Sequence, residues 1–197
     1  MLIPLPFKWP YLVAFWAVYV WAFAPEFAVL GRSPLARRGP AEDRGSLRVI
    51  LIGFNVAIVA AFASPFAVPW ARLPGDPAIW FVAGLALLAA GSFLRRHCFR
   101  VLGKFFTGAV TIQEEHRLVD GGAYRWVRHP SYSAALLMVL GISLALDNWI
   151  GVLVATAVAV LVYSYRAHVE EQALLGSLGA PYAEFMATRK RFVPFVY

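Results

Sequence analysis

The sequence predicts an all-α integral membrane protein with about five transmembrane helices. Hydrophobic residues make up 60% of its 197 residues, and charged residues only 15%. A soluble domain is nearer a quarter charged, so these apolar residues must face lipid as well as a core. The apolar residues also gather in stretches near the ~20 residues that a spanning helix needs. Basic residues fill the segments between these stretches, as they do in membrane proteins.

The N-terminal region, residues 1–94, is expected to form three membrane helices. The apolar stretches run over residues 10–30, 47–70 and 78–94. A polar loop over residues 31–48 separates the first two, and a short turn rich in proline and glycine separates the second and third. Lys8 is the only early charge and the apolar run after it is long, so we read the first stretch as a retained helix.

Residues 95–197 are expected to form the functional core. A long polar segment over 95–129 is followed by apolar stretches at 130–146 and 150–165, joined by a tight turn. These two stretches are slightly short for full spans. We therefore expect a membrane hairpin over 130–168, dipping into the bilayer with little tilt, and a cytoplasmic C-terminal segment over 169–197.

The distribution of charge predicts the orientation. The chain has a net charge of +7, but its basic residues do not gather on one soluble module, which argues against nucleic acid as a partner. With five spans, the loop 31–48, the segment 95–129 and the C-terminal tail share one side. That side holds nearly all the Arg and Lys, and the other holds Lys8 and Arg72. We expect the N-terminus outside, the C-terminus in the cytoplasm, and, from the Ala-, Arg- and Gly-rich composition, a bacterial inner membrane.

The run from Gly122 to Tyr132, GAYRWVRHPSY, is the strongest functional signal. Pro130 suits the first turn of a helix and pushes His129 to an extended conformation. Backbone N–H groups at such a helix start favour an anionic group such as a carboxylate. An ordinary basic flank would explain the two arginines. It explains the other polar residues less well, and polar clusters at a membrane are functional candidates. Those residues are Tyr124, His129, Ser131 and Tyr132.

A second polar cluster follows the last apolar stretch, with Arg166, Glu170 and Glu171. Arg166 and Glu170 are four residues apart, so they share one face of a helix. A plain salt bridge is one interpretation. The other is a site for a zwitterionic ligand, in which Glu accepts from an amine or from ribose hydroxyls and Arg binds a carboxylate through two N–H groups.

Other reactive side chains give weaker signals. Cys98 is the single cysteine, and a buried, inert thiol is the favoured interpretation over a nucleophile. His97, His116 and His168 match no metal-ligand spacing, so no metal is expected. Glu26, near the inner end of the first stretch, is expected to reach the headgroups.

Together, these motifs resemble the isoprenylcysteine carboxyl methyltransferase family, whose wider group includes phospholipid N-methyltransferases. The resemblance runs from near Phe105 to the C-terminus and rests on the order and spacing of several short pieces. Before the hairpin they are His116, Arg117, Leu118 and Val119; Gly122, Ala123 and Tyr124; and Arg128, His129, Pro130, Ser131 and Tyr132. After it they are Arg166, Glu170, Glu171, Leu174, Gly179, Tyr182, Arg191 and Pro194.

The resemblance implies an enzyme that uses S-adenosyl-methionine, bound in a cytoplasmic pocket made by the loop before the fourth helix and the C-terminal tail. The implied cofactor-binding residues are His116, Arg117, Leu118, Val119, Tyr124, His129, Pro130, Ser131, Tyr132 and Glu170. Arg166 would bind the substrate, and Arg166 and Glu170 would form the catalytic pair. The implied acceptor is a lipophilic small molecule or a lipidated molecule that enters from the bilayer. A carboxylate acceptor needs no general base, while an amine, a thiol or a small isoprenoid stays open.

Two other functions remain open from the sequence. One is a membrane reductase of the sterol-reductase type using NADPH, whose phosphates would suit the basic segment 95–128. The other is a non-catalytic membrane protein with a degenerate pocket. The Arg-His-Pro-x-Tyr run and the spacing of Glu170 and Glu171 favour the methyltransferase.

Overall fold

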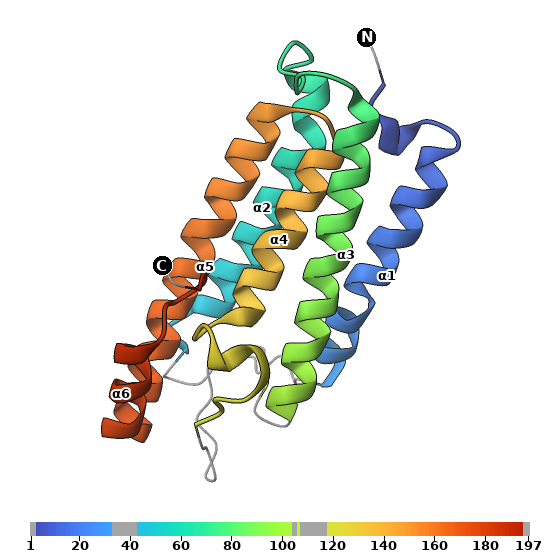
Figure 1. Ribbon diagram of the computed structural model, residues 1–197. Helices are drawn as coiled ribbons and strands as arrows, with labels where there is room; N and C mark the ends of the chain where they lie inside the picture. The colour runs from blue at the N-terminus through green and yellow to red at the C-terminus, as the bar shows by residue number, and fades with distance from the viewer. Residues whose placement is uncertain (1–2, 33–42, 104–105, 107–117, 195–197) are drawn as a thin grey trace.

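The computed structural model describes residues 3–32, 43–103, 106 and 118–194. Within these ranges every secondary-structure element is a helix, which confirms the predicted all-α class. The elements are η1 (Leu5–Phe7), α1 (Tyr11–Arg32), α2 (Ser46–Ala67), α3 (Pro77–Leu102), η4 (Gly122–Arg125), α4 (Pro130–Ala145), α5 (Trp149–Leu178) and α6 (Ala180–Thr188). Figure 1 shows α1 to α5 side by side as a bundle, with η4 and α6 gathered at one end.

Helix lengths agree with a membrane protein, with one correction. By length and composition, α2, α3 and α5 can each cross a membrane, while the apolar part of α1 and all of α4 are shorter. The predicted shortness of the fourth stretch is confirmed, because α4 has 16 residues. The expectation that the fifth stretch is also slightly short for a span is wrong, because the stretch belongs to a longer helix. Helix α5 has 30 residues, about 45 Å, and continues unbroken to Leu178.

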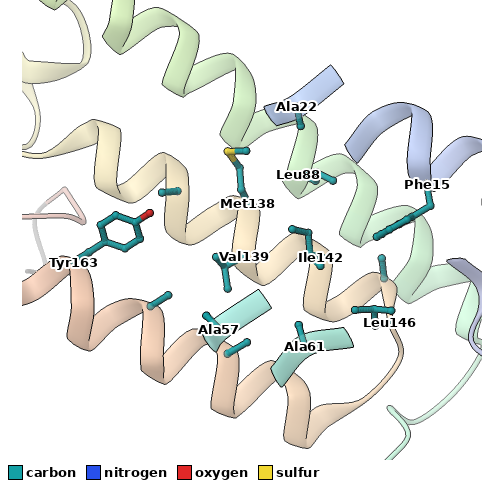
Figure 2. Packing of buried hydrophobic residues seen from close by; sticks show 14 of the residues in the cluster. Phe15, Ala22, Ala57, Ala61, Leu88, Met138, Val139, Ile142, Leu146 and Tyr163 are labelled. Carbon is teal, nitrogen blue, oxygen red and sulfur yellow. The ribbon is translucent and has the colours of Figure 1, made fainter. Parts of the chain in front are cut away.

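Helix α4 lies between α3 and α5, and α2 packs along α5 (Figure 1). Small residues allow α3 and α4 to approach closely, as is common between membrane helices. A Cβ on Gly84 would lie 2.5 Å from the carbonyl oxygen of Gly141. Figure 2 shows Met138, Val139 and Ile142 of α4 filling the centre of this packing. The buried α4 therefore holds its first turn in a fixed place at the end of the bundle.

The turn between α4 and α5 is fixed to the end of α2. Asn148 caps α5, with its Oδ1 accepting from the Gly151 N–H at 3.0 Å, and its Nδ2 donates to the Val68 carbonyl at 2.9 Å. Arg72 donates to Asp147 at 2.6 Å. These contacts set the relative height of α4 and α5, and so bring the candidate residues of both helices to the same level at the opposite end.

Candidate active site

The start of α4 is held by the C-terminal segment. His129 is the N-cap of α4, and the N–H groups of Arg128 and His129 donate to the carbonyls of Lys190 and Arg191 at 2.9 and 3.0 Å. Ser133 Oγ donates to the Phe192 carbonyl at 2.6 Å. The predicted contact between the loop before the fourth helix and the C-terminal tail is therefore present.

The expected row of open N–H donors at this helix start is largely used by the protein itself. The His129 carbonyl accepts from the N–H groups of Tyr132 and Ser133 at 3.0 and 3.1 Å. Pro130 has no N–H, and the His129 N–H is bound to the C-terminal segment. The first turn and the tail therefore engage the N–H groups of Tyr132, Ser133 and His129, and the binding of an anion at this helix start stays a prediction.

Glu171 is buried and fixes these segments to α5. Its side chain is 2% exposed and accepts from Arg128 Nε at 2.9 Å and from Arg191 Nη2 at 2.6 Å. His129 Nε2 lies 3.0 Å from the same carboxylate. Because its partners come from the α4 start and from the C-terminal segment, Glu171 has a structural role.

Glu170, the next residue, has a different environment. Its side chain is 33% exposed, and its Oε2 accepts from the Tyr132 hydroxyl at 2.6 Å. The Tyr132 ring stacks on the His129 ring, with their centroids 5.2 Å apart and their planes 7° apart. It also stacks on the Tyr163 ring, with a centroid distance of 5.3 Å. A partly open carboxylate therefore lies beside a stack of aromatic rings, which is a suitable place for a cationic ligand.

Arg166 joins this cluster from one turn earlier on α5. Its Nε donates to the Tyr132 hydroxyl at 3.4 Å, and that hydroxyl donates to Glu170, so Tyr132 links the two predicted catalytic residues. Its Nη1 donates to Asp43 and Ser46 at the start of α2. The ion pair with Asp43 was not predicted, although Asp43 followed by Ser46 is a sequence signal for a helix start.

Tyr124 lies buried in η4, next to the α3 end. Burial raises the pKa of its phenol well above the usual value, and the Cys98 thiol and the Glu170 carboxylate add to that effect. Its hydroxyl hydrogen-bonds Cys98, which is buried, as expected. Leu118 and Val119 are half-buried in the irregular segment leading to η4, whereas His116 and Arg117 lie outside the described residues.

Ser131 is engaged by α3. Its hydroxyl and carbonyl oxygens accept from Arg95 Nη1 at 2.8 and 3.0 Å. The same guanidinium donates to both carboxylate oxygens of Glu26, an ion pair that the sequence did not predict. Arg95 therefore gives Glu26 of α1 a charged partner on α3 and also holds Ser131 at the start of α4.

The structure therefore brings four predicted residues, His129, Tyr132, Arg166 and Glu170, into one connected cluster. In the described part of the chain, no group of three His, Cys, Asp or Glu side chains is placed to hold a metal. A cavity of about 330 Å³ lies nearby, lined by Arg128 and residues 186–191. Part of the C-terminal tail lines this cavity, as predicted for the pocket, but Glu170 and Arg166 do not line it.

Comparisons with known proteins agree with this architecture. A sequence model described as phospholipid methyltransferase matches residues 79–180, more than half of the chain. Protein-S-isoprenylcysteine O-methyltransferases B and A of Arabidopsis thaliana are each 32% identical over 127 residues, 62% of this chain and 64% of theirs. The enzyme of Saccharomyces cerevisiae is 31% identical over 117 residues, 58% of this chain and 49% of its own. The chain thus spans just under two thirds of the plant relatives' length.

A solved structure shares the fold. The eukaryotic intramembrane Ras methyltransferase ICMT (isoprenylcysteine carboxyl methyltransferase), solved without a monobody, superimposes with a TM-score of 0.59. The two chains are 24% identical, and the match covers 74% of this chain and 52% of that one. The membrane-helix bundle predicted from the sequence is therefore confirmed at the level of the fold.

Proposed function

The chain belongs to the phospholipid methyltransferase family, and from this premise we propose that it is an integral-membrane enzyme that methylates the carboxylate of a lipophilic acceptor, with S-adenosyl-methionine as methyl donor. The relatives named protein-S-isoprenylcysteine O-methyltransferases support this class of reaction. The observation that carries the proposal is the Tyr132 hydroxyl, which joins a partly exposed Glu170 to a buried Arg166.

The donor side of the site is Glu170 with the rings of His129 and Tyr132. S-adenosyl-methionine carries a sulfonium and an amine, and a carboxylate next to aromatic faces suits both cations. When bound, it supplies an electrophilic methyl group, whose bond to sulfur breaks as a bond to oxygen forms. We assign the remaining surface of this pocket to the other residues named by the family resemblance. They are His116, Arg117, Leu118, Val119, Tyr124, Pro130 and Ser131.

Arg166 forms the acceptor side. A guanidinium can bind both oxygens of a carboxylate in one plane and so fix the attacking oxygen. The Arg166 side chain is 4% exposed, so it works in a place with little water, where such a pair is strong. A carboxylate is ionised at neutral pH, so no general base is needed and the residues contribute alignment and dehydration.

We propose that the active end of the bundle faces the cytoplasm, with the N-terminus outside, in a bacterial inner membrane. Arg95, Arg128 and Arg166 lie at the active end, whereas Arg72 lies by the α4–α5 turn at the other. An excess of arginine marks the cytoplasmic side of a membrane protein. The acceptor, a lipophilic small molecule or a lipidated molecule, would reach Arg166 from the bilayer.

Titration calorimetry of the detergent-purified protein with S-adenosyl-homocysteine tests the donor site, and NADPH serves as the parallel ligand. We expect micromolar binding of S-adenosyl-homocysteine and a loss of about 1.5–3 kcal/mol in Glu170→Gln, because an ionic acceptor is removed. Saturable NADPH binding without S-adenosyl-homocysteine binding would replace the proposal with a reductase.

Methyl transfer tests the acceptor site. An S-farnesyl-cysteine with a free carboxylate should accept labelled methyl from S-adenosyl-methionine, and its carboxamide should not. The label should be released by mild base, as expected of an ester. Equal labelling of the carboxamide, or a base-stable product, would mean that the acceptor atom is not a carboxylate oxygen.

A further inference from the structure

A carboxylate of the protein already occupies the guanidinium of Arg166. Asp43 and Arg166 are 123 residues apart in sequence, and both side chains are buried where the start of α2 meets α5. Arg166 Nη1 donates to Asp43 Oδ1 and to Ser46 Oγ. Ser46 Oγ in turn donates to Asp43 at 3.1 Å, so the three side chains form a closed cluster.

We propose that Asp43 holds the position on Arg166 that the acceptor carboxylate takes, and that the acceptor binds by displacing Asp43. This inference rests on the proposed function, which gives Arg166 the acceptor. Arg166 then has two alternating carboxylate partners, one from the protein and one from the substrate.

The charges around Arg166 favour an exchange of Asp43 for the acceptor over binding of both carboxylates at once. The acceptor carboxylate would join Asp43 and Glu170 around a single guanidinium, because Glu170 reaches Arg166 through the Tyr132 hydroxyl. Three carboxylates around one buried cation repel each other strongly in a low dielectric. One carboxylate must therefore leave when the acceptor enters.

Asp43 is better able to leave than Glu170. Its second oxygen, Oδ2, accepts from the Leu47 N–H at 3.1 Å, so Asp43 also caps the first turn of α2. A helix start stabilises a carboxylate through its free N–H groups and its dipole. After release from Arg166, Asp43 keeps this partner. Glu170 lies within the long helix α5, with its backbone fixed on both sides.

The exchange would favour release of the product. The acceptor is an anion and competes with Asp43 for Arg166, but its methyl ester is neutral and cannot. Asp43 would return to Arg166 once the ester forms and so displace the product. The same competition would exclude neutral lipids from the acceptor position.

Steady-state kinetics of Asp43→Asn test the proposal, with S-farnesyl-cysteine as acceptor and its methyl ester as inhibitor. We expect a KM for the acid about tenfold lower than in the unaltered protein, and inhibition by the ester at about tenfold lower concentration. Binding of S-adenosyl-homocysteine should change by less than about twofold. Asp76→Asn is the matched control, because Asp76 caps α3 at the other end of the bundle and should alter neither constant.

A higher KM or a lower kcat in Asp43→Asn, with unchanged S-adenosyl-homocysteine binding, would overturn the proposal. Asp43 would then be a permanent positioning residue of Arg166. Methyl transfer by the unaltered protein is measured first: its absence would refute the proposed function itself, and with it the acceptor position on Arg166. Its presence with unchanged constants in Asp43→Asn would refute the exchange alone.

Hydrogen exchange gives a second test that needs no variant. With S-adenosyl-homocysteine bound, adding the farnesyl-cysteine acid should speed amide exchange in the first turn of α2, residues 46–49. The reason is that Arg166 would no longer tie the start of α2 to α5 through Asp43. The methyl ester should have no such effect. Slower or unchanged exchange with the acid would mean that Asp43 stays on Arg166, which would overturn the proposal.

Discussion

Replacing Glu171 by glutamine should destabilise the protein much more than the same change at Glu170. Glu171 is buried and accepts from Arg128 and Arg191, with His129 at 3.0 Å. The substitution keeps the shape of the side chain but removes its charge. It leaves two arginines near a neutral amide whose own N–H groups point toward donors.

The magnitude follows from the partners that Glu171 loses. Removing one member of a buried ion pair costs about 3–5 kcal/mol, since the remaining charge is left without compensation. For a chain of this length, each kcal/mol shifts Tm by about 2–4 °C, so we expect a drop of about 6–20 °C. Glu170→Gln should cost about 1 kcal/mol or less, because Glu170 is one-third exposed and has one strong hydrogen bond, from Tyr132.

Thermal unfolding in detergent measures the difference, with both variants purified in the same way. Limited proteolysis adds a local test, because the segment 189–194 docks on the α4 start through partners of Glu171 and should be cut sooner in Glu171→Gln. Equal Tm values for the two variants would refute the structural role of Glu171. Loss of S-adenosyl-homocysteine binding in Glu171→Gln at a temperature where it remains folded would instead place Glu171 in the ligand site.

Other changes test separate parts of the reasoning. Arg166→Lys should raise the acceptor KM about tenfold or more while S-adenosyl-homocysteine affinity, measured by calorimetry, changes little, because an ammonium cannot bind both carboxylate oxygens. Gly141→Ala should lower the unfolding free energy by about 1–3 kcal/mol, since its Cβ would lie 2.6 Å from the Gly84 carbonyl oxygen. Gly176→Ala, with open space around it on α5, should instead stabilise by up to about 1 kcal/mol in the same melting assay. Glu26→Gln should cost about 1–3 kcal/mol by leaving Arg95 without its ion pair. The buried Cys98 thiol should react with a maleimide only after unfolding, as read by mass spectrometry.

The sequence predicts the membrane helices well because each depends on local composition. Hydropathy found the apolar stretches, and Pro130 gave the start of α4 at the correct residue. Hydropathy located the fifth apolar stretch at residues 150–165 but did not give the length of the helix that contains it. The polar residues that follow are strong helix formers, so the helix continues until Gly179, where a positive φ of 61° ends it. Helix propensity, unlike hydropathy, contained that information.

Contacts between distant segments could not be predicted in this way. The pairs Asp43–Arg166 and Glu26–Arg95 join residues 123 and 69 positions apart, and no local pattern specifies which helices will meet. The spacing of Arg166 and Glu170 predicted that both lie on one face of a helix, and both contact the Tyr132 hydroxyl in the structure. The spacing did not reveal that Arg166 already holds the Asp43 carboxylate.

The two adjacent glutamates differ because the C-terminal segment docks on one of them and not on the other. Neighbouring residues on a helix point about 100° apart, so Glu170 and Glu171 must face different surroundings. The C-terminal segment covers Glu171 and brings it Arg191, while the α4 start brings Arg128. Its carboxylate is then committed to the fold and cannot serve a ligand without the loss of those partners. Glu170, next to Tyr132 and one-third exposed, has fewer partners in the fold to lose and is the acid that we propose for ligand binding. The docking of the tail on Glu171 therefore leaves Glu170 as the glutamate proposed to bind the ligand.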